Sequence, residues 1–159
     1  MKRLTIFTLT MLALTGTMVT TALAQNPHFL SCSASGPDKS GDLLDCFRIA
    51  GLGSTPTEVT VSADVTAVYA CRNHGDQCPN AANKQSVTST QTATGTFTPR
   101  NGQVRGCLAV SPPPATLNCP GNQTAVLVSV SYSNVQVSAV GTSCSSSGTF
   151  SENFFPNCP

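Results

Sequence analysis

The stretch CRNHGDQCPNAANK, from Cys71 to Lys84, holds the residues of this chain that are best suited to chemistry. Two cysteines flank a histidine and an aspartate there, and thiolate, imidazole and carboxylate groups are the usual ligands of zinc. Zinc sites nevertheless use close pairs such as C-x-x-C, whereas six residues separate Cys71 from Cys78. The chain also lacks the C-x-x-C motif of thioredoxin-type redox sites. We therefore predict no metal and no redox chemistry in this loop.

The same loop is a candidate for binding. His74, Asp76 and Asn83 are its candidate contact residues, and Asn, Gly and Pro supply turn geometry around them. The loop is longer than a simple connection between strands needs. We predict a surface loop, stapled by disulfides, that contacts another protein. The alternative is a small-ligand or metal site built on residues 71–84.

The cysteines are more informative than the loop. The chain has eight of them, an even number, and all lie beyond the first 24 residues. In an exported protein such a set predicts a disulfide framework, because oxidising compartments allow disulfides to persist. We expect four bonds from the following residues: Cys32, Cys46, Cys71, Cys78, Cys107, Cys119, Cys144 and Cys158.

Export is predicted by the start of the chain. A basic MKR is followed by a mainly apolar run, Leu4–Leu14, and then by the small residues of Ala22-Leu23-Ala24, which is the three-part pattern of a secretory signal peptide. We assign residues 1–24 to the signal peptide and residues 25–159 to one domain, secreted to the periplasm or the extracellular space. No second apolar run is present, so we expect no membrane insertion.

Composition excludes several function classes. Loss of Lys2 and Arg3 with the signal peptide leaves six basic and seven acidic residues, with no basic cluster for nucleic acid. Two histidines and seven scattered acids provide no clear acid-base pair, and no nucleophile-elbow, phosphate-loop or H-E-x-x-H motif occurs. We therefore predict no catalytic activity and no cofactor. A monomer that contacts an extracellular or envelope protein is the expectation.

Periodicity predicts an all-β fold. Apolar residues alternate with polar ones from Val59 to Cys71, and again from Val126 to Tyr132, which is typical of half-buried strands. The apolar parity then switches at Val135, which predicts a β-bulge near Ser133 and Asn134. Shorter strands are expected over 29–34, 43–49, 85–98, 103–110 and 148–155. About seven strands separated by Gly- and Pro-rich turns predict an immunoglobulin-like antiparallel β-sandwich, stapled by disulfides.

The predicted strands suggest how the cysteines pair. Cys32 and Cys46 are equidistant from Lys39 in the first turn, so a hairpin would set them opposite each other. If residues 85–110 form one hairpin, the cysteines at 71, 78, 107 and 119 gather at one end of the sandwich. Cys144 and Cys158 are then left to each other by elimination. Their pairing requires the tail to fold back, because fourteen extended residues span roughly 45 Å.

Several motifs resemble a group of small exported bacterial proteins. They are Y-x-C-x-N-x-G from Tyr69, P-x-A-x-N-K from Pro79, S-P-P-P from Ser111, L-x-C-P-G-x-Q from Leu117 and V-S-Y from Val130. The resemblance implies a signal peptide and one β domain, with no established activity. It also implies a Cys71–Cys119 bond, which leaves Cys78 for Cys107. Local pairing, 71 with 78 and 107 with 119, is the competing arrangement.

Overall fold

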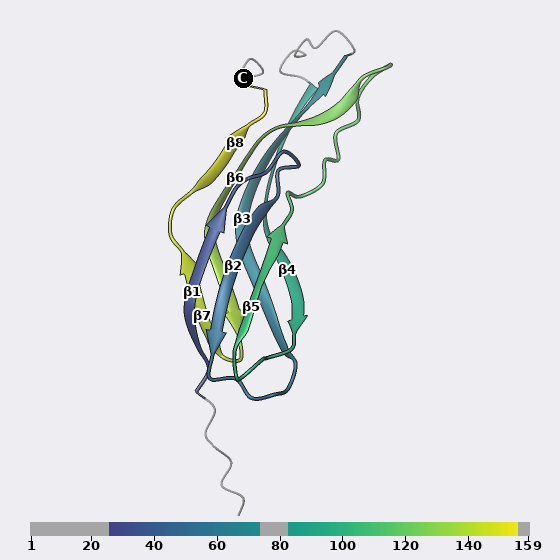
Figure 1. Ribbon diagram of the computed structural model, residues 1–159. Coiled ribbons are helices and arrows are strands. Elements are labelled where there is room, and N and C mark those ends of the chain that lie inside the picture. Colours follow the sequence, from purple (N-terminus) through teal and green to yellow (C-terminus); the bar gives the residue numbers. More distant parts are fainter. Residues whose placement is uncertain (1–25, 74–82, 156–159) are drawn as a thin grey trace, which may run out of the picture.

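The protein is an all-β sandwich of two antiparallel sheets. The computed structural model describes residues 26–73 and 83–155, and within them the chain forms eight strands and no helix (Figure 1). The strands are β1 (His28–Ser35), β2 (Leu43–Ala50), β3 (Thr57–Arg72), β4 (Lys84–Phe97), β5 (Val104–Val110), β6 (Thr124–Ala139), β7 (Thr142–Ser146) and β8 (Phe150–Asn153).

The strand order is that of an immunoglobulin-like fold. One sheet has the order β1-β2-β5, and the other has the order β4-β3-β6-β7, with β8 pairing β6. In immunoglobulin lettering these are A-B-E and C′-C-F-G. The predicted fold class is therefore confirmed. The strand that sequence periodicity missed is β7, whose residues, TSCSS, show no apolar alternation.

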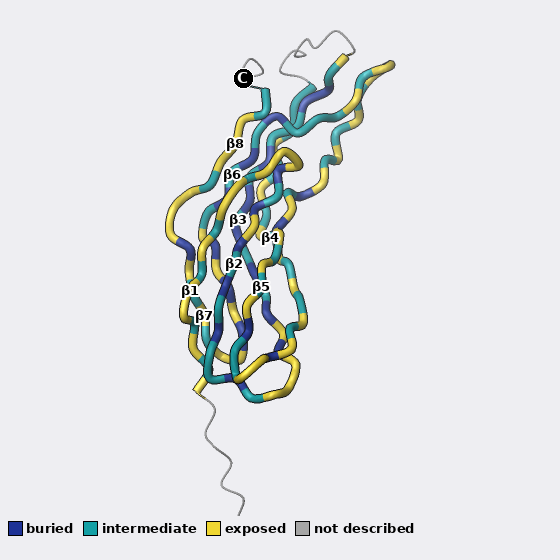
Figure 2. The backbone as a smooth tube through the Cα atoms, in the orientation of Figure 1, coloured by how far each residue is buried: buried dark blue, intermediate teal, exposed yellow. Residues whose placement is uncertain are grey.

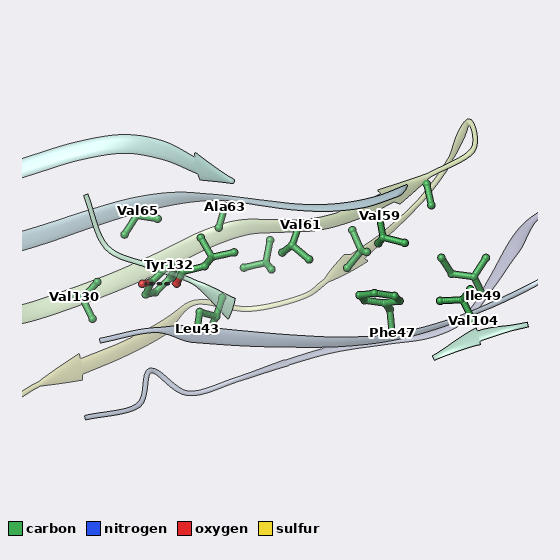
Figure 3. Close-up of a cluster of buried hydrophobic side chains, with 14 of the residues drawn as sticks. Leu43, Phe47, Ile49, Val59, Val61, Ala63, Val65, Val104, Val130 and Tyr132 are labelled. Carbon is green, nitrogen blue, oxygen red and sulfur yellow. Dashed lines mark hydrogen bonds between the residues drawn. The ribbon is translucent and has the colours of Figure 1, made fainter. Parts of the chain in front are cut away.

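The core lies between the sheets and follows the predicted alternation. Odd-numbered residues of β3 from Val59 to Ala67 are buried, and they face Leu43, Phe47 and Ile49 of β2 (Figure 3). Phe47 packs edge-on against Phe97 of β4 with ring centroids 5.2 Å apart. Buried residues alternate with more exposed ones along the strands (Figure 2). Burial of aliphatic side chains on this scale is the main stabilising contribution to the sandwich.

The predicted bulge in β6 is confirmed. Ser62 of β3 pairs with Gln136, and Asp64 pairs with Ser133, so one residue of β3 faces two residues of β6. Asn134 adopts a φ of 51°, a left-handed conformation that asparagine tolerates better than most residues. Because of the extra residue, Tyr132 and Val135 both point into the core.

Tyr132 joins both sheets through its hydroxyl group. The side chain is fully buried, and its hydroxyl lies 2.6 Å from the carbonyl oxygen of Gly41 and 3.0 Å from that of Val110. Burial raises the pKa of the Tyr132 phenol, so the hydroxyl stays protonated and able to donate. A comparable bond from a β-strand tyrosine to backbone occurs in the tyrosine corner of immunoglobulin-like domains. The hydroxyl thereby links β6 to the turn before β2 and to the end of β5.

Three disulfides connect the described residues. Cys46 and Cys107 lie directly opposite each other in the β2–β5 pair, with Cα atoms 4.0 Å apart. The other two bonds are Cys32–Cys144 and Cys71–Cys119, with Cα separations of 6.1 and 5.4 Å. The Cys71–Cys119 pairing that the family resemblance implies is confirmed, and the local pairing is wrong.

The predicted Cys32–Cys46 bond is wrong because of a one-residue difference in register. Cys32 pairs with Phe47 across the β1–β2 hairpin, and Ser33 pairs with Cys46. Neighbouring positions of a strand point to opposite faces of the sheet. Cys32 therefore packs against the core, where it bonds Cys144 of the facing sheet, while Cys46 points outward to Cys107.

The predicted Cys78–Cys107 and Cys144–Cys158 bonds are also wrong, since Cys107 and Cys144 have other partners. The cause is the assignment of residues 85–110 to one hairpin, because β4 and β5 belong to different sheets. β5 pairs with β2, which carries Cys107 away from Cys71. Cys78 and Cys158 lie outside the described residues.

Candidate interaction surface

The proline segment, Ser111–Asn118, packs against the larger sheet, β4-β3-β6-β7, hereafter the large sheet, at one end of the sandwich. The hydroxyl of Tyr69 in β3 donates to the carbonyl oxygen of Pro113 at 2.7 Å. The amide of Thr116 donates to Oε1 of Gln85 at 2.9 Å, and the Gln85 amide also donates to the Thr116 hydroxyl. The Cys71–Cys119 disulfide closes the end of the segment. Contacts from both β3 and β4 therefore position a segment that has no strand pairing of its own.

The outward side of the proline segment is exposed. Ser111, Pro114, Thr116 and Asn118 are exposed, whereas Pro113 is buried. Proline restricts φ, so this part of the chain has little backbone freedom left to lose on contact with a partner. The segment offers small polar groups and a proline ring on a fixed backbone.

The predicted binding loop begins beside this segment. Arg72, at the end of β3, places its guanidinium 4.3 Å from the centre of the Phe155 ring, in cation–π geometry. Asn83 is half-buried directly before β4. His74 and Asp76 lie outside the described residues. The structure therefore places one of the three predicted contact residues next to the strand that holds the proline segment.

The outer face of the large sheet is rich in hydroxyl groups. Cross-strand hydroxyl pairs join Thr60 to Thr94 at 3.1 Å and Thr66 to Thr88 at 3.0 Å. Between these pairs, Asp64 accepts hydrogen bonds from Thr90 at 2.7 Å and from Asn134 at 2.8 Å. The bond from Asn134 and, to a smaller extent, the bond from Thr90 hold the pKa of Asp64 below its usual value of 3.8. Asp64 is thus an ionised group engaged by neighbouring side chains.

A shallow depression lies next to Asn134. It has a volume of about 450 Å³ and is lined mainly by polar side chains of β6 and β7, among them Gln136 and Ser145. Its lining includes no histidine, lysine or aromatic residue. General acid-base catalysis requires a titratable group within hydrogen-bond reach of the substrate, and stacking of a sugar requires an aromatic ring. The depression offers hydrogen bonds to polar groups and neither of those functions.

Asp45 is a buried carboxyl group that sequence reasoning did not single out. It lies in β2 between Leu43 and Phe47 on the inward face, and its exposed fraction is 0%. Its Oδ2 accepts a hydrogen bond from Ser146 of β7 at 3.0 Å, while Oδ1 has no hydrogen-bond partner among the described residues. Burial raises the pKa of Asp45, and the Ser146 hydroxyl and the Ser33 backbone oppose that shift. The sequence signal that could have predicted this burial is the alternation of Leu43, Phe47 and Ile49, which places Asp45 on the same face of the strand.

Within residues 26–73 and 83–155, no three His, Cys, Asp or Glu side chains come together as metal ligands. No helix in those ranges is long and apolar enough to cross a membrane.

No protein-family model, curated protein or solved structure matches this chain. The proline segment is the candidate interaction surface, because Tyr69, Gln85 and the Cys71–Cys119 bond hold its backbone in place.

Proposed function

We propose that this chain is a secreted structural or interaction module without catalytic activity, and that it contacts an extracellular or envelope protein. Residues 1–24 act as its signal peptide, and residues 25–159 form the exported domain. The contact surface is the end of the sandwich that carries the exposed side of the proline segment. Asn83 borders it, and His74 and Asp76 belong to the same loop in sequence.

The observation that carries the proposal is the attachment of the proline segment to the large sheet. A disulfide, a tyrosine hydroxyl and a glutamine amide together hold eight residues that form no strand of their own. An ordered loop loses little conformational entropy on binding, so more of its contact energy contributes to affinity. A role in stabilising the domain would not by itself require the exposed residues of the proline segment to be held in one conformation.

The disulfides support the proposed compartment. Three bonds lie within the described residues, and disulfides persist mainly in secreted and periplasmic proteins. The signal-peptide pattern at residues 1–24 is a separate line of support. The periplasm or the extracellular space is therefore the compartment in which we expect the partner.

A pull-down from the native envelope and extracellular fractions tests the proposal. The bait is the mature chain, and the variant is Pro114→Arg/Asn118→Arg, which places two large charges at exposed positions without removing any described hydrogen bond or disulfide. We expect a specific partner that wild type captures and the variant loses. Circular dichroism checks that the variant is folded.

Ser54→Arg/Thr55→Arg is the matched control, because it adds the same two charges at exposed positions. Ser54 is exposed in the turn between β2 and β3, at the opposite end of the sandwich (Figure 1). The control should retain the partner. Equal capture by all three proteins, or no capture by wild type, would refute the proposed surface. Stoichiometric metal in the purified wild type would instead favour the metal-binding alternative.

A further inference from the structure

β4 is a long terminal strand whose outer side pairs with no strand of the described chain. It is the first strand in the order β4-β3-β6-β7 and runs for 14 residues, Lys84–Phe97. Its pairing with β3 continues from Phe97 to Lys84 without a register shift. Such an edge presents a row of unpaired backbone N–H and C=O groups. The row is a ready template for another strand.

The other edge strands are protected in the ways that natural sheets use. β1 is interrupted by a bulge between Phe29 and Ser31, and β7 and β8 have only five and four residues. β5 has seven residues, includes Arg105, and is followed by the proline segment. Bulges, short strands, charges and prolines all discourage pairing with another chain. β4 has none of these devices between Gln85 and Thr98.

We propose that β4 is a homotypic interface, through which a second copy of this chain pairs antiparallel and joins the two large sheets into one. The two-fold axis passes beside Gln91, and residues before it pair with residues after it in the partner. This inference concerns the side of the large sheet and not its proline-segment end. It also departs from the monomer expected from the sequence.

The side chains of β4 are self-complementary about Gln91. On the exposed face, antiparallel pairing sets hydroxyl against hydroxyl three times: Thr90 opposite Thr92, Thr88 opposite Thr94 and Ser86 opposite Thr96. On the inward face, Ser89 meets Ala93, Val87 meets Gly95, and Gln91 meets its own counterpart at the axis. Threonine pairs of this kind stabilise antiparallel strands. This two-fold match about Gln91 favours a second copy of β4 over an unrelated peptide as the pairing strand.

Charge does not oppose the association. No ionisable residue lies between Lys84 and Arg100, and the chain without residues 1–24 has a nearly balanced six basic and seven acidic residues. Two carboxylates of β3 lie beside β4 on the exposed face: Glu58 is opposite Thr96, and Asp64 is opposite Thr90 and accepts hydrogen bonds from Thr90 and Asn134. Backbone hydrogen bonds along β4 would supply the affinity, and the isologous arrangement closes at two copies.

Sedimentation and light scattering of the mature chain over a range of concentrations test the proposal. We expect a monomer–dimer equilibrium that Gln91→Lys weakens by about tenfold or more, because two like charges then face each other across the axis. Gln91 is half-buried on the inward face and donates to the Ser89 hydroxyl at 2.8 Å, so circular dichroism checks that Gln91→Lys is folded. The charge control is Gln136→Lys, at an exposed site of β6, whose two neighbours are β3 and β7. The control should dimerise as wild type does.

Cross-linking provides a second readout, which traps a dimer even when its affinity is weak. Gln91→Cys should form a covalent dimer under mild oxidation, since each new thiol meets its counterpart at the axis, whereas Gln136→Cys should not. A strictly monomeric wild type that yields no Gln91→Cys dimer would overturn the proposal. So would a dimer equally tolerant of Gln91→Lys and Gln136→Lys. Neither result bears on the proline-segment surface, because the pull-down variants lie elsewhere.

Discussion

Tyr132→Phe isolates the contribution of one buried hydroxyl to the link between the sheets. The ring stays in place, so apolar packing is retained and only the hydroxyl is lost. The single O–H proton that the carbonyl oxygens of Gly41 and Val110 share is then lost at a fully buried site. Loss of a buried hydrogen bond with acceptors left unsatisfied costs about 1–3 kcal/mol. We expect a decrease of that size in the free energy of unfolding.

Urea denaturation followed by circular dichroism, with the disulfides intact, measures this effect. The denaturant slope should stay constant, because the surface exposed on unfolding is unchanged. Tyr69→Phe is the control, since this second tyrosine also donates to a backbone carbonyl but is only half-buried. Water can replace its bond, so we expect a loss of at most about 1 kcal/mol. Equal losses in the two variants would refute the role given to burial at Tyr132.

Two further predictions concern ionisation and covalent structure. Burial raises the pKa of Asp45 above 3.8. Between pH 3.8 and the raised pKa, the native state therefore binds more protons than the unfolded chain. The free energy of unfolding should fall as the pH rises through that window. Asp45→Asn should abolish this fall in a urea series at several pH values, whereas Asp64, with its lowered pKa, acts only below pH 3.8. An unchanged pH profile in Asp45→Asn would contradict the assignment. The intact mass of the unreduced mature chain should lie eight hydrogens below that of the reduced chain, because all eight cysteines are expected to be oxidised. Peptide mapping should recover Cys32–Cys144, Cys46–Cys107 and Cys71–Cys119, and any Cys32–Cys46 peptide would contradict the structure.

Strand periodicity determined most of the fold from the sequence. Alternation over 59–71 predicted β3, and the parity switch at Val135 predicted the bulge in β6. Both are local consequences of the two-residue period of a strand, which requires no knowledge of the partner strand. β7 was missed because serine and threonine occupy both of its faces, so its sequence carries no period. The candidate site followed the same division, since the proline segment was visible in sequence and its attachment to Tyr69 and Gln85 was not.

The tertiary structure alone decided which cysteines pair, where Asp45 lies and which edge stays open. Pairing in the first hairpin depends on a one-residue register, and that single residue moves Cys32 from the outer face to the core. The partner of β5 could not be read locally either, because β2 lies more than fifty residues earlier in the chain and competes with the adjacent β4. Sequence fixes the face of each residue relative to its neighbours in the same strand, whereas strand partners and register follow from burying all the apolar faces together. For that reason the exposed threonines of β4 were predictable as a strand, and their position at a free edge was not.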